Sequence, residues 1–326
     1  MPVTTVERDP DTLTMTIVAD FDVPVRRLWD AYADPRQLEK FWGPPEYPAT
    51  FTRHDLRPGG RSHFVMTGPE GDTSAGYWEF QAVEEGRSFA VIDGFADEDH
   101  RPSAEMPTMW MTFTFEETSS GSRLTTVTTF GSLEELEQLL QMGLEEGTAA
   151  AMGQIDAVLA DLQSFAAGGT TEVDILSDTQ VRFSRIIRGS VEQVWRAHHE
   201  QDLLRRWLLG PDGWVMTGAT VGRSAGETYR YAWAPGDGLE GQPFALSGQI
   251  LESSEPHREV TTETMEGNDG PPTVNEQTLT AVDGGTLLSL VITYADAETR
   301  DAVLATGMAE GMETSYARLE SEVLAP

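Results

Sequence analysis

The stretch Val25–Pro44, which reads VRRLWDAYADPRQLEKFWGP, decides the fold because it occurs twice in the chain. The second copy is Val191–Pro211, VEQVWRAHHEQDLLRRWLLGP, with one residue inserted before the Gly-Pro pair. Trp29 of the first copy matches Trp195 of the second. Similarity between two halves at a domain-sized spacing indicates a duplicated domain, because solenoid repeats have far shorter periods.

Length and composition fit two domains of ordinary size in a chain of 326 residues. The absence of cysteine excludes disulfides, thiolate metal sites and cysteine nucleophiles. The formal net charge is −32 and both halves are acidic, so the field repels nucleic acid and anionic membranes. The N-terminus shows no export signal, and no apolar run approaches the ~20 residues that span a bilayer. We therefore expect a cytoplasmic protein with neither nucleic-acid nor membrane partners.

The order of predicted elements is the same in both halves. In the first half, Leu13–Phe21 alternates like a strand, Pro24 begins a short helix, and Asp34-Pro35 begins a second one. Strand-like runs separated by turn residues follow between residues 49 and 130, and again between 214 and 295 in the second half. A long helix is predicted to close each half, at Ser132–Phe165 and at Ala297–Leu324.

This order predicts an α+β fold in each half, with a curved antiparallel sheet wrapped on the long C-terminal helix. A helix that is raised from such a sheet leaves a cavity between the two. Ala166–Gly169 is the predicted linker. We expect one domain at residues 1–167 and a second at 170–326, and each should fold alone.

These residues resemble the START-like (SRPBCC, Bet v 1-like) superfamily and its helix-grip fold. Within it they resemble the heat-shock protein 90 ATPase activator homologue family. The first copy carries the resemblance in Pro24, Leu28-Trp29-Asp30-Ala31, Asp34-Pro35, Phe41-Trp42-Gly43-Pro44, Gly59-Gly60 and Gly143-Leu144-Glu145-Glu146-Gly147. The second copy carries it in Val194-Trp195-Arg196-Ala197, Trp207, Gly210-Pro211, Gly284-Gly285-Thr286 and Gly307-Met308-Ala309-Glu310-Gly311. The resemblance covers nearly the whole chain, in two tandem copies.

Relatives in this superfamily include lipid carriers, hormone receptors, aromatase/cyclases and co-chaperone domains, so the resemblance implies three functions. The first is non-enzymatic binding of a small apolar or amphipathic molecule in the cavity of each half, without a cofactor. The second is a module that interacts with a chaperone, in the manner of the heat-shock protein 90 ATPase activators. The third is a cyclase or dehydratase acting in the same cavity.

Residues for catalysis or metal binding are sparse in the sequence. None of the six histidines has a histidine partner four residues away, so no metal site is expected. His198 and His199 are interpreted as packing or surface residues on the first short helix of the second copy. An inward-facing acid or base with a shifted pKa would support an enzyme, and Glu263 and His63 are the candidates.

The predicted ligand site consists of aromatic and methionine side chains on single strand faces, because side chains alternate along a strand. Such faces, with a few polar groups, suit a pocket for an apolar molecule. The predicted ligand-binding residues are Phe64, Met66, Met109, Met111, Phe113, Gly143, Gly147, Tyr229, Tyr231, Trp233, Glu263, Gly307, Met308 and Gly311.

Two pairs of glycines lie four residues apart in the predicted long helices, Gly143 with Gly147 and Gly307 with Gly311. Within one helix each pair shares a face, where the missing side chains either let the helix press closely on the sheet or leave room for a ligand. The second use is favoured in the first copy, because small residues occupy the early part of the predicted helix and large apolar ones the later part. Because a glycine inside a helix costs about 1 kcal/mol relative to alanine, we expect Gly143→Ala and Gly307→Ala to raise stability.

Overall fold

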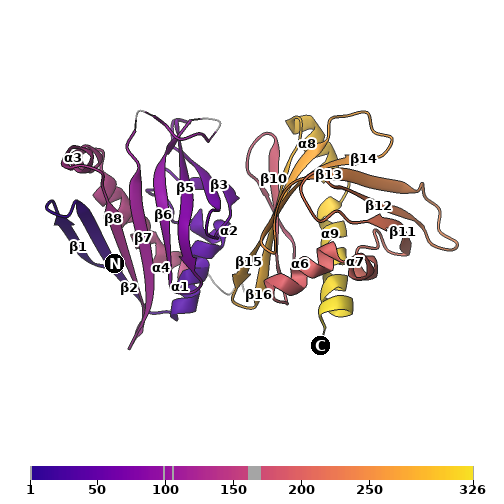
Figure 1. Ribbon diagram of the computed structural model, residues 1–326, viewed down its shortest axis with the longest axis horizontal. Helices are drawn as coiled ribbons and strands as arrows, with labels where there is room; N and C mark the ends of the chain where they lie inside the picture. Colours follow the sequence, from indigo (N-terminus) through magenta and orange to yellow (C-terminus); the bar gives the residue numbers. More distant parts are fainter. Residues whose placement is uncertain (1, 98–99, 105, 161–169, 326) are drawn as a thin grey trace. The chain divides into compact units, whose positions relative to one another are not determined.

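The computed structural model describes residues 2–97, 100–104, 106–160 and 170–325. The chain divides into two compact units, Met1–Phe165 and Ala166–Pro326, which we call unit 1 and unit 2 (Figure 1). The predicted linker Ala166–Gly169 lies outside the described residues. The domain boundary expected between residues 167 and 170 and the predicted helix end at Phe165 also fall there.

Unit 1 contains one eight-stranded antiparallel sheet in the order β1-β2-β8-β7-β6-β5-β4-β3. Its strands are β1 (Val3–Asp9), β2 (Thr14–Phe21), β3 (Ala49–His54), β4 (Arg61–Thr67), β5 (Thr73–Glu84), β6 (Ser88–Ala96), β7 (Met109–Thr118) and β8 (Gly121–Thr129). Its helices are α1 (Val25–Ala33), α2 (Pro35–Leu38), α3 (Leu133–Gln141) and α4 (Leu144–Ala160).

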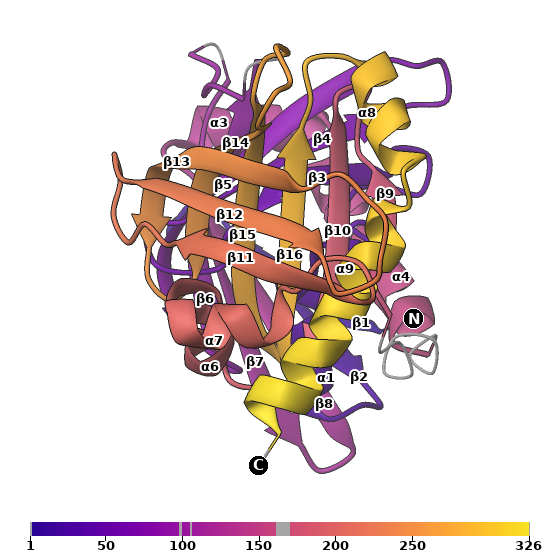
Figure 2. The same ribbon diagram turned by 90° about the vertical axis from the view of Figure 1, so that its right-hand side faces the viewer.

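Unit 2 repeats this order with an eight-stranded sheet, β11-β12-β13-β14-β15-β16-β10-β9. Its strands are β9 (Glu172–Ile175), β10 (Gln180–Ile187), β11 (Trp214–Thr220), β12 (Thr228–Pro235), β13 (Phe244–Ser254), β14 (Arg258–Met265), β15 (Thr273–Val282) and β16 (Gly285–Thr293). Its helices are α6 (Val191–His199), α7 (Gln201–Trp207), α8 (Ala297–Leu304), α9 (Met308–Arg318) and the π-helical turn η1 (Leu319–Leu324). The helix α9, yellow in Figure 2, packs on the sheet through Tyr316.

The predicted α+β fold class is confirmed, and the short helices begin where the sequence places them. Ser190 accepts a hydrogen bond from the Gln193 backbone N–H at 3.3 Å, and the Gln193 side chain accepts one from the Ser190 N–H at 2.9 Å. This reciprocal pair satisfies two N–H groups that the first turn of a helix leaves free. Asp34 caps α2 by a one-way bond, in which its side chain accepts from the Arg36 N–H at 2.9 Å. Each unit also has one strand before the first predicted strand, β1 and β9.

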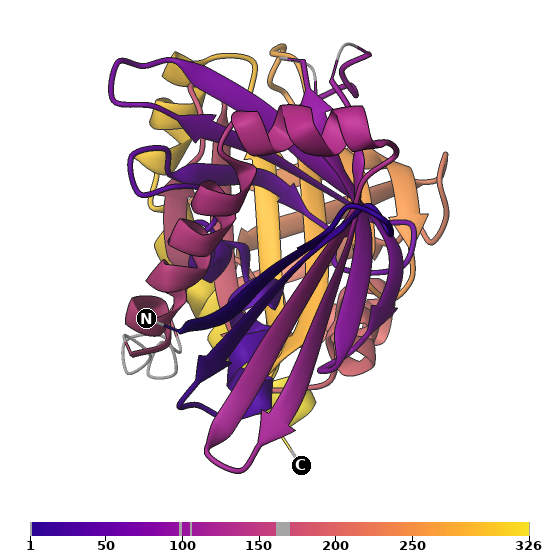
Figure 3. The same cartoon turned by 90° about the vertical axis from the view of Figure 1, so that its left-hand side faces the viewer.

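The prediction of one continuous C-terminal helix is wrong in both units, because a glycine divides the segment into two helices. Gly143 separates α3 from α4 with φ +87°, and Gly307 separates α8 from α9 with φ +82°. A positive φ is the left-handed conformation that glycine adopts without steric cost. The helices α3 and α4 are accordingly two separate helices in Figure 3. Gly143 and Gly147 therefore do not share a face of one continuous helix, and neither do Gly307 and Gly311.

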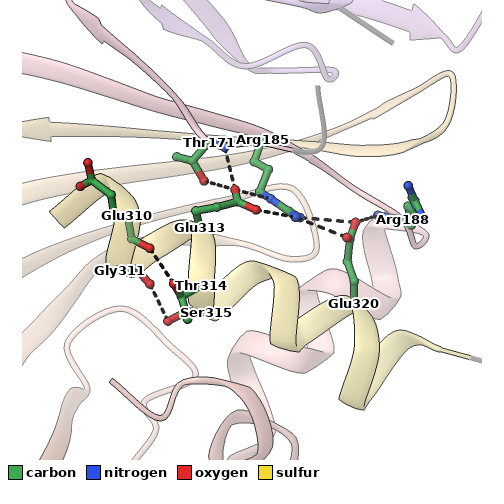
Figure 4. Close-up of polar contacts among 9 residues, drawn as sticks. All are labelled: Thr171, Arg185, Arg188, Glu310, Gly311, Glu313, Thr314, Ser315 and Glu320. Carbon is green, nitrogen blue, oxygen red and sulfur yellow. Dashed lines mark hydrogen bonds and ion pairs between the residues drawn. The ribbon is translucent and has the colours of Figure 1, made fainter. Parts of the chain in front are cut away.

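The matching helix of each unit is held on its sheet by different contacts. In unit 2 the buried Arg185 of β10 donates from Nε to Glu313 of α9 at 2.9 Å, and lies 3.4 Å from Glu320 of η1 (Figure 4). Thr171 also donates to Glu313, from its hydroxyl at 2.9 Å. In unit 1, Ala19 of β2 occupies the position equivalent to Arg185 and is fully buried. An ionic clamp in unit 2 thus corresponds to an apolar contact in unit 1.

Candidate functional site

Each unit contains a cavity between the inner face of its sheet and the helix that follows the glycine break. The cavity of unit 2 has a volume of about 400 Å³, and that of unit 1 about 290 Å³. Cavities that bind small ligands typically measure ~300–1,000 Å³ and are lined mainly by apolar and aromatic side chains. Both cavities match this description, and we call them cavity 1 and cavity 2 after their units.

The sheet side of cavity 2 is an aromatic wall. Tyr229, Tyr231 and Trp233 of β12 line it from one strand face, as alternation predicts. Their neighbouring ring centroids lie 5.2 Å and 6.3 Å apart. Phe244 extends the wall by stacking on Trp233 at 4.9 Å. The Trp233 indole N–H donates to the Leu208 carbonyl at 2.9 Å, so this buried ring is held in one orientation.

A buried carboxyl group contacts this wall. The Tyr229 hydroxyl lies 2.9 Å from the Thr262 carbonyl and 3.1 Å from Glu263 Oε2, so it can donate to either. Burial raises the pKa of Glu263 above its usual range, although hydrogen bonds from Tyr229 and Asn275 oppose the shift. Cavity 2 therefore combines a flat apolar surface with one polar corner.

The helical side of cavity 2 comes from α6, α7 and α9. Trp207 and Tyr316 stack there with centroids 5.9 Å apart, and Met308 and Gly311 line the cavity from the first turn of α9. The α9 helix begins directly after its N-cap Gly307, whose carbonyl accepts from the Gly311 N–H at 3.1 Å. The glycine break therefore aims the beginning of α9 at the cavity.

Cavity 1 is built on the same plan with different side chains. Phe64, Met66 and Met109 line it from the sheet, and Gly143 and Gly147 line it from α4 and the break before it. Gly76 makes the position of Phe64 possible, because a Cβ at residue 76 would clash with the Phe64 ring. The remaining residues that bear on its chemistry are Trp42, Asp93 and Met142.

Asp93 is the polar group of cavity 1. Its Oδ1 accepts a hydrogen bond from the Trp78 indole N–H at 2.8 Å. Burial raises the pKa of Asp93 to about 7, with the Trp78 bond acting in the opposite direction. Asp93 is therefore the ionisable residue that lines cavity 1, where the other polar side chains, such as Ser74 and Thr148, are neutral.

Most of the predicted ligand-binding residues line one of the two cavities. In cavity 1 they are Phe64, Met66, Met109, Gly143 and Gly147. In cavity 2 they are Tyr229, Tyr231, Trp233, Glu263, Met308 and Gly311. Met111 and Phe113 instead pack in the core of unit 1, with 3% and 1% of their surface exposed. Gly307 lies at the break before α9 and is not part of the cavity lining.

The histidine side chains have two kinds of environment. His198 and His199 pack on aromatic rings, His198 on Trp207 and His199 on Trp195, and both also line cavity 2. His63 stacks on His100 with ring centroids 4.7 Å apart and does not line cavity 1. Within the described residues, no group of three or more His, Asp or Glu side chains could hold a metal ion.

Sequence signals for the missed residues did exist. His198 matches Tyr32 of the first copy, and Tyr32 is a buried core residue, so His198 should face inward as well. Asp93 follows Phe89 and Val91 at alternate positions of β6, and both of these are buried. A charged residue in the inward register of a strand indicates a polar position in a core or cavity.

The chain belongs to the family described as Activator of Hsp90 ATPase homolog 1-like protein, as the sequence resemblance predicts. The family model matches twice, at residues 22–160 and 188–323. Each unit is therefore one SRPBCC-type domain of this family, and the chain is a tandem duplication. Among the described residues, no helix has both the length and the apolar character to cross a membrane.

Several solved structures are similar to parts or all of the chain. Protein Ms6760 from Mycobacterium smegmatis is 56% identical over 48% of this chain and 97% of its own, with a TM-score of 0.46. A protein from Arthrobacter aurescens is 42% identical over 49% of this chain and 92% of its own, with a TM-score of 0.47. DynU16, from the dynemicin biosynthetic locus, covers 95% of this chain and 98% of its own at 14% identity and a TM-score of 0.34. The comparison with curated proteins finds no match.

Proposed function

We propose that this chain is a non-enzymatic binder of small apolar or amphipathic molecules, with one ligand cavity in each unit. The observation that carries the proposal is the repeated geometry of a cavity between the sheet and the helix after the glycine break. Two copies keep the break and the cavity although most of the lining differs. An unfilled cavity in a protein core lowers stability, so its presence in both copies supports a binding role.

The lining favours amphipathic ligands over fully apolar ones. In cavity 2 the aromatic wall is next to Glu263, and in cavity 1 the methionines are next to Asp93. A buried polar group that is close to a ligand can fix its orientation, while the aromatic and methionine surfaces provide affinity. Methionine adapts its shape to irregular molecules, so cavity 1 suits ligands of varied outline.

Binding is favoured over a cyclase or dehydratase reaction by the state of the ionisable groups. Burial lowers the pKa of His198 to about 4, which makes it a weak base at neutral pH. An effective general base has a pKa near the working pH. Two carboxyl groups remain as candidates for an enzyme, Glu263 in cavity 2 and Asp93 in cavity 1. Each already accepts a hydrogen bond, Glu263 from the Tyr229 hydroxyl and Asp93 from the Trp78 indole N–H.

A chaperone-interacting module is the alternative that the family description supports. An ATPase assay with the host chaperone tests it directly. Unchanged ATPase activity at saturating chain would exclude that module, whereas stimulation would favour it over a ligand carrier. Nucleic acid and membranes are proposed not to be partners, because the net charge of −32 repels phosphate groups.

The proposed function is tested by native mass spectrometry of the full chain purified from its own host. We expect a bound small molecule, up to two per chain, that is released on unfolding and has an apolar or amphipathic structure. A chain that carries no small molecule and also binds no apolar probe in vitro would contradict the proposal.

A further inference from the structure

His198 lies in the last turn of α6, and its ring nitrogens have different roles. Nδ1 is 2.8 Å from the carbonyl oxygen of Val194, one helical turn earlier. A carbonyl oxygen can only accept a hydrogen bond, so Nδ1 carries the proton. Burial holds the pKa of His198 at about 4, against a smaller opposite effect of the Val194 bond. At neutral pH the ring is therefore uncharged, and Nε2 is a hydrogen-bond acceptor.

Nε2 of His198 is buried and has no hydrogen-bond partner among the described residues. Because Nδ1 faces the backbone of α6, Nε2 lies on the other side of the ring, away from that helix. The ring neighbours of His198 are Trp207 and Tyr316, with centroids at 4.8 Å and 6.4 Å. Both of these residues line cavity 2 together with His198. An unsatisfied buried acceptor is unfavourable unless something donates to it.

The adjacent His199 also lines this cavity, but both of its ring nitrogens have hydrogen-bond partners in the protein. His199 Nδ1 is 2.8 Å from the Trp195 carbonyl, and its Nε2 is 3.1 Å from Glu259 Oε1. Both nitrogens of His199 therefore have protein partners. Of the two histidines that line cavity 2, His198 is the one whose second nitrogen is left for a ligand.

The shape of cavity 2 restricts the ligand further. The wall formed by Tyr229, Tyr231 and Trp233 lies on the sheet side, and the stacked pair Trp207 and Tyr316 lies on the helical side. Aromatic rings favour other aromatic rings in stacked or edge-to-face contact. A planar aromatic molecule can make such contacts with the aromatic rings of either side, whereas a flexible acyl chain has no ring to stack.

We propose that His198 is a specificity residue of cavity 2, and that this cavity binds planar aromatic molecules whose hydroxyl group donates to His198 Nε2. This inference rests on the proposed function, since it names the ligand class of one proposed cavity. Cavity 1 has no equivalent acceptor at this position, because the matching Tyr32 packs in the core against Phe41 at 5.0 Å.

The test is isothermal titration calorimetry of the full chain at pH 7 with 2-naphthol and 2-methoxynaphthalene. These probes share one ring system, and only the first has an O–H to donate. We expect 2-naphthol to bind about fivefold to tenfold more tightly at one of the sites, the gain typical of one buried hydrogen bond. In His198→Phe this preference should disappear, while the affinity for 2-methoxynaphthalene should change less than about twofold. Tyr32→Phe, the matched variant in unit 1, should retain it.

The outcomes separate the inference from the proposed function. If neither probe binds the folded chain, the ligand-binding function itself is contradicted. If both bind wild type equally, or if folded His198→Phe keeps the preference, the role of His198 alone is contradicted. His198→Met serves as the second variant if circular dichroism shows that His198→Phe does not fold. The preference should also stay constant between pH 6 and 8, and a loss within that range would contradict a neutral acceptor.

Discussion

The two cavities have the same position in the fold and each contains a carboxyl group, but their unpartnered polar atoms differ. Cavity 1 contains Asp93 and the indole of Trp42, whose buried N–H has no hydrogen-bond partner among the described residues. Cavity 2 contains the imidazole of His198, whose buried Nε2 likewise has none in that part of the chain. Cavity 1 therefore offers a buried donor and cavity 2 a buried acceptor, at positions that do not match between the two copies. Duplication preserved the cavity-forming backbone, and the lining diverged on top of it.

The attachment of the closing helix differs in the same way between the units. In unit 2, α9 is held by ion pairs from Arg185 to Glu313 and Glu320. In unit 1, α4 is held by Gln154, whose side-chain amide donates to the Gly43 carbonyl at 2.9 Å, and by an ion pair from Arg8 of β1 to Glu145 in which the arginine is exposed. The buried cation Arg185 should therefore contribute more to the stability of unit 2 than the exposed cation Arg8 contributes to unit 1.

Arg185→Met gives the largest expected effect. It leaves Glu313 and Glu320 without their buried cation, and breaking a buried ion pair costs about 3 kcal/mol. Calorimetric unfolding should show a lower melting temperature for unit 2 and an unchanged unit 1. The control is Arg123→Met in unit 1, whose solvent-exposed pair with Asp20 should contribute little to stability. Equal effects of the two substitutions would contradict the clamp.

The same clamp predicts a dependence on acid. Burial alone would raise the pKa of Glu313, but hydrogen bonds from Arg185 and Thr171 outweigh it and leave the pKa below its usual value. The stabilisation is therefore complete above the unfolded pKa of about 4.3 and is lost as the pH falls through the folded value. In Arg185→Met this acid-dependent loss in unit 2, followed by calorimetric unfolding across the acid range, should become smaller.

Asp93→Asn is expected to stabilise unit 1 above neutral pH. The folded pKa of Asp93 is about 7, so the native state binds more protons than the unfolded state between about 4 and 7. Stability of the wild type therefore falls as the pH rises through this range. At pH 8 the variant should be more stable by about 2 kcal/mol, allowing for partial solvation, and the carbonyl of the introduced amide can still accept from Trp78. At pH 4 the two proteins should unfold alike in chemical denaturation, and a pH-independent difference would contradict the buried carboxyl.

The glycine breaks should tolerate alanine poorly, contrary to the expectation from the sequence. Gly143 and Gly307 have φ values of +87° and +82°, where a Cβ costs about 1 kcal/mol. At Gly143 an added Cβ would meet no atom of the described residues within 4 Å, so the cost comes from the backbone and not from a clash. Chemical denaturation should show both alanine variants destabilised by about 1 kcal/mol. A gain in stability would contradict the positive φ at these glycines and support the continuous helix that the sequence predicts.

The second glycine of each pair should respond in the opposite direction. Gly147 and Gly311 lie in the first turns of α4 and α9. An added Cβ at Gly147 would meet only Pro44 Cγ, at 3.8 Å. Alanine at either position should stabilise by about 0.5 kcal/mol, through helix propensity alone. Loss of stability in both variants, measured by the same denaturation, would show that these positions are closely packed and not open to a cavity.

The sequence predicts the architecture well because the signals that define it are local. Ser190 caps α6 and Asp34 caps α2, as their spacing indicates. The helix breaks were missed because Gly143 and Gly307 are compatible with a helix in sequence alone. Their positive φ values show that each glycine ends one helix before the next begins, which glycine often does. A periodic pattern of apolar residues continues across such a break and conceals it.

The candidate site is predicted in part, for a similar physical reason. Strand alternation places Tyr229 and Tyr231 on one face, and both line cavity 2. Alternation cannot distinguish the part of that face that lines a cavity from the part that packs, which is why the prediction includes Phe113. The properties of His198 depend on burial and on the Val194 carbonyl, so they appear only in the folded structure.

The central claim is that each unit has an open ligand cavity beside the helix that follows its glycine break. Titration with the neutral dye N-phenyl-1-naphthylamine, followed by fluorescence, tests it most directly, because the dye is not repelled by the acidic chain. We expect wild type to bind two dye molecules, Gly147→Leu and Gly311→Leu one each, and the double variant none, with all variants folded. A folded double variant that still binds two dye molecules with unchanged affinity would contradict the claim.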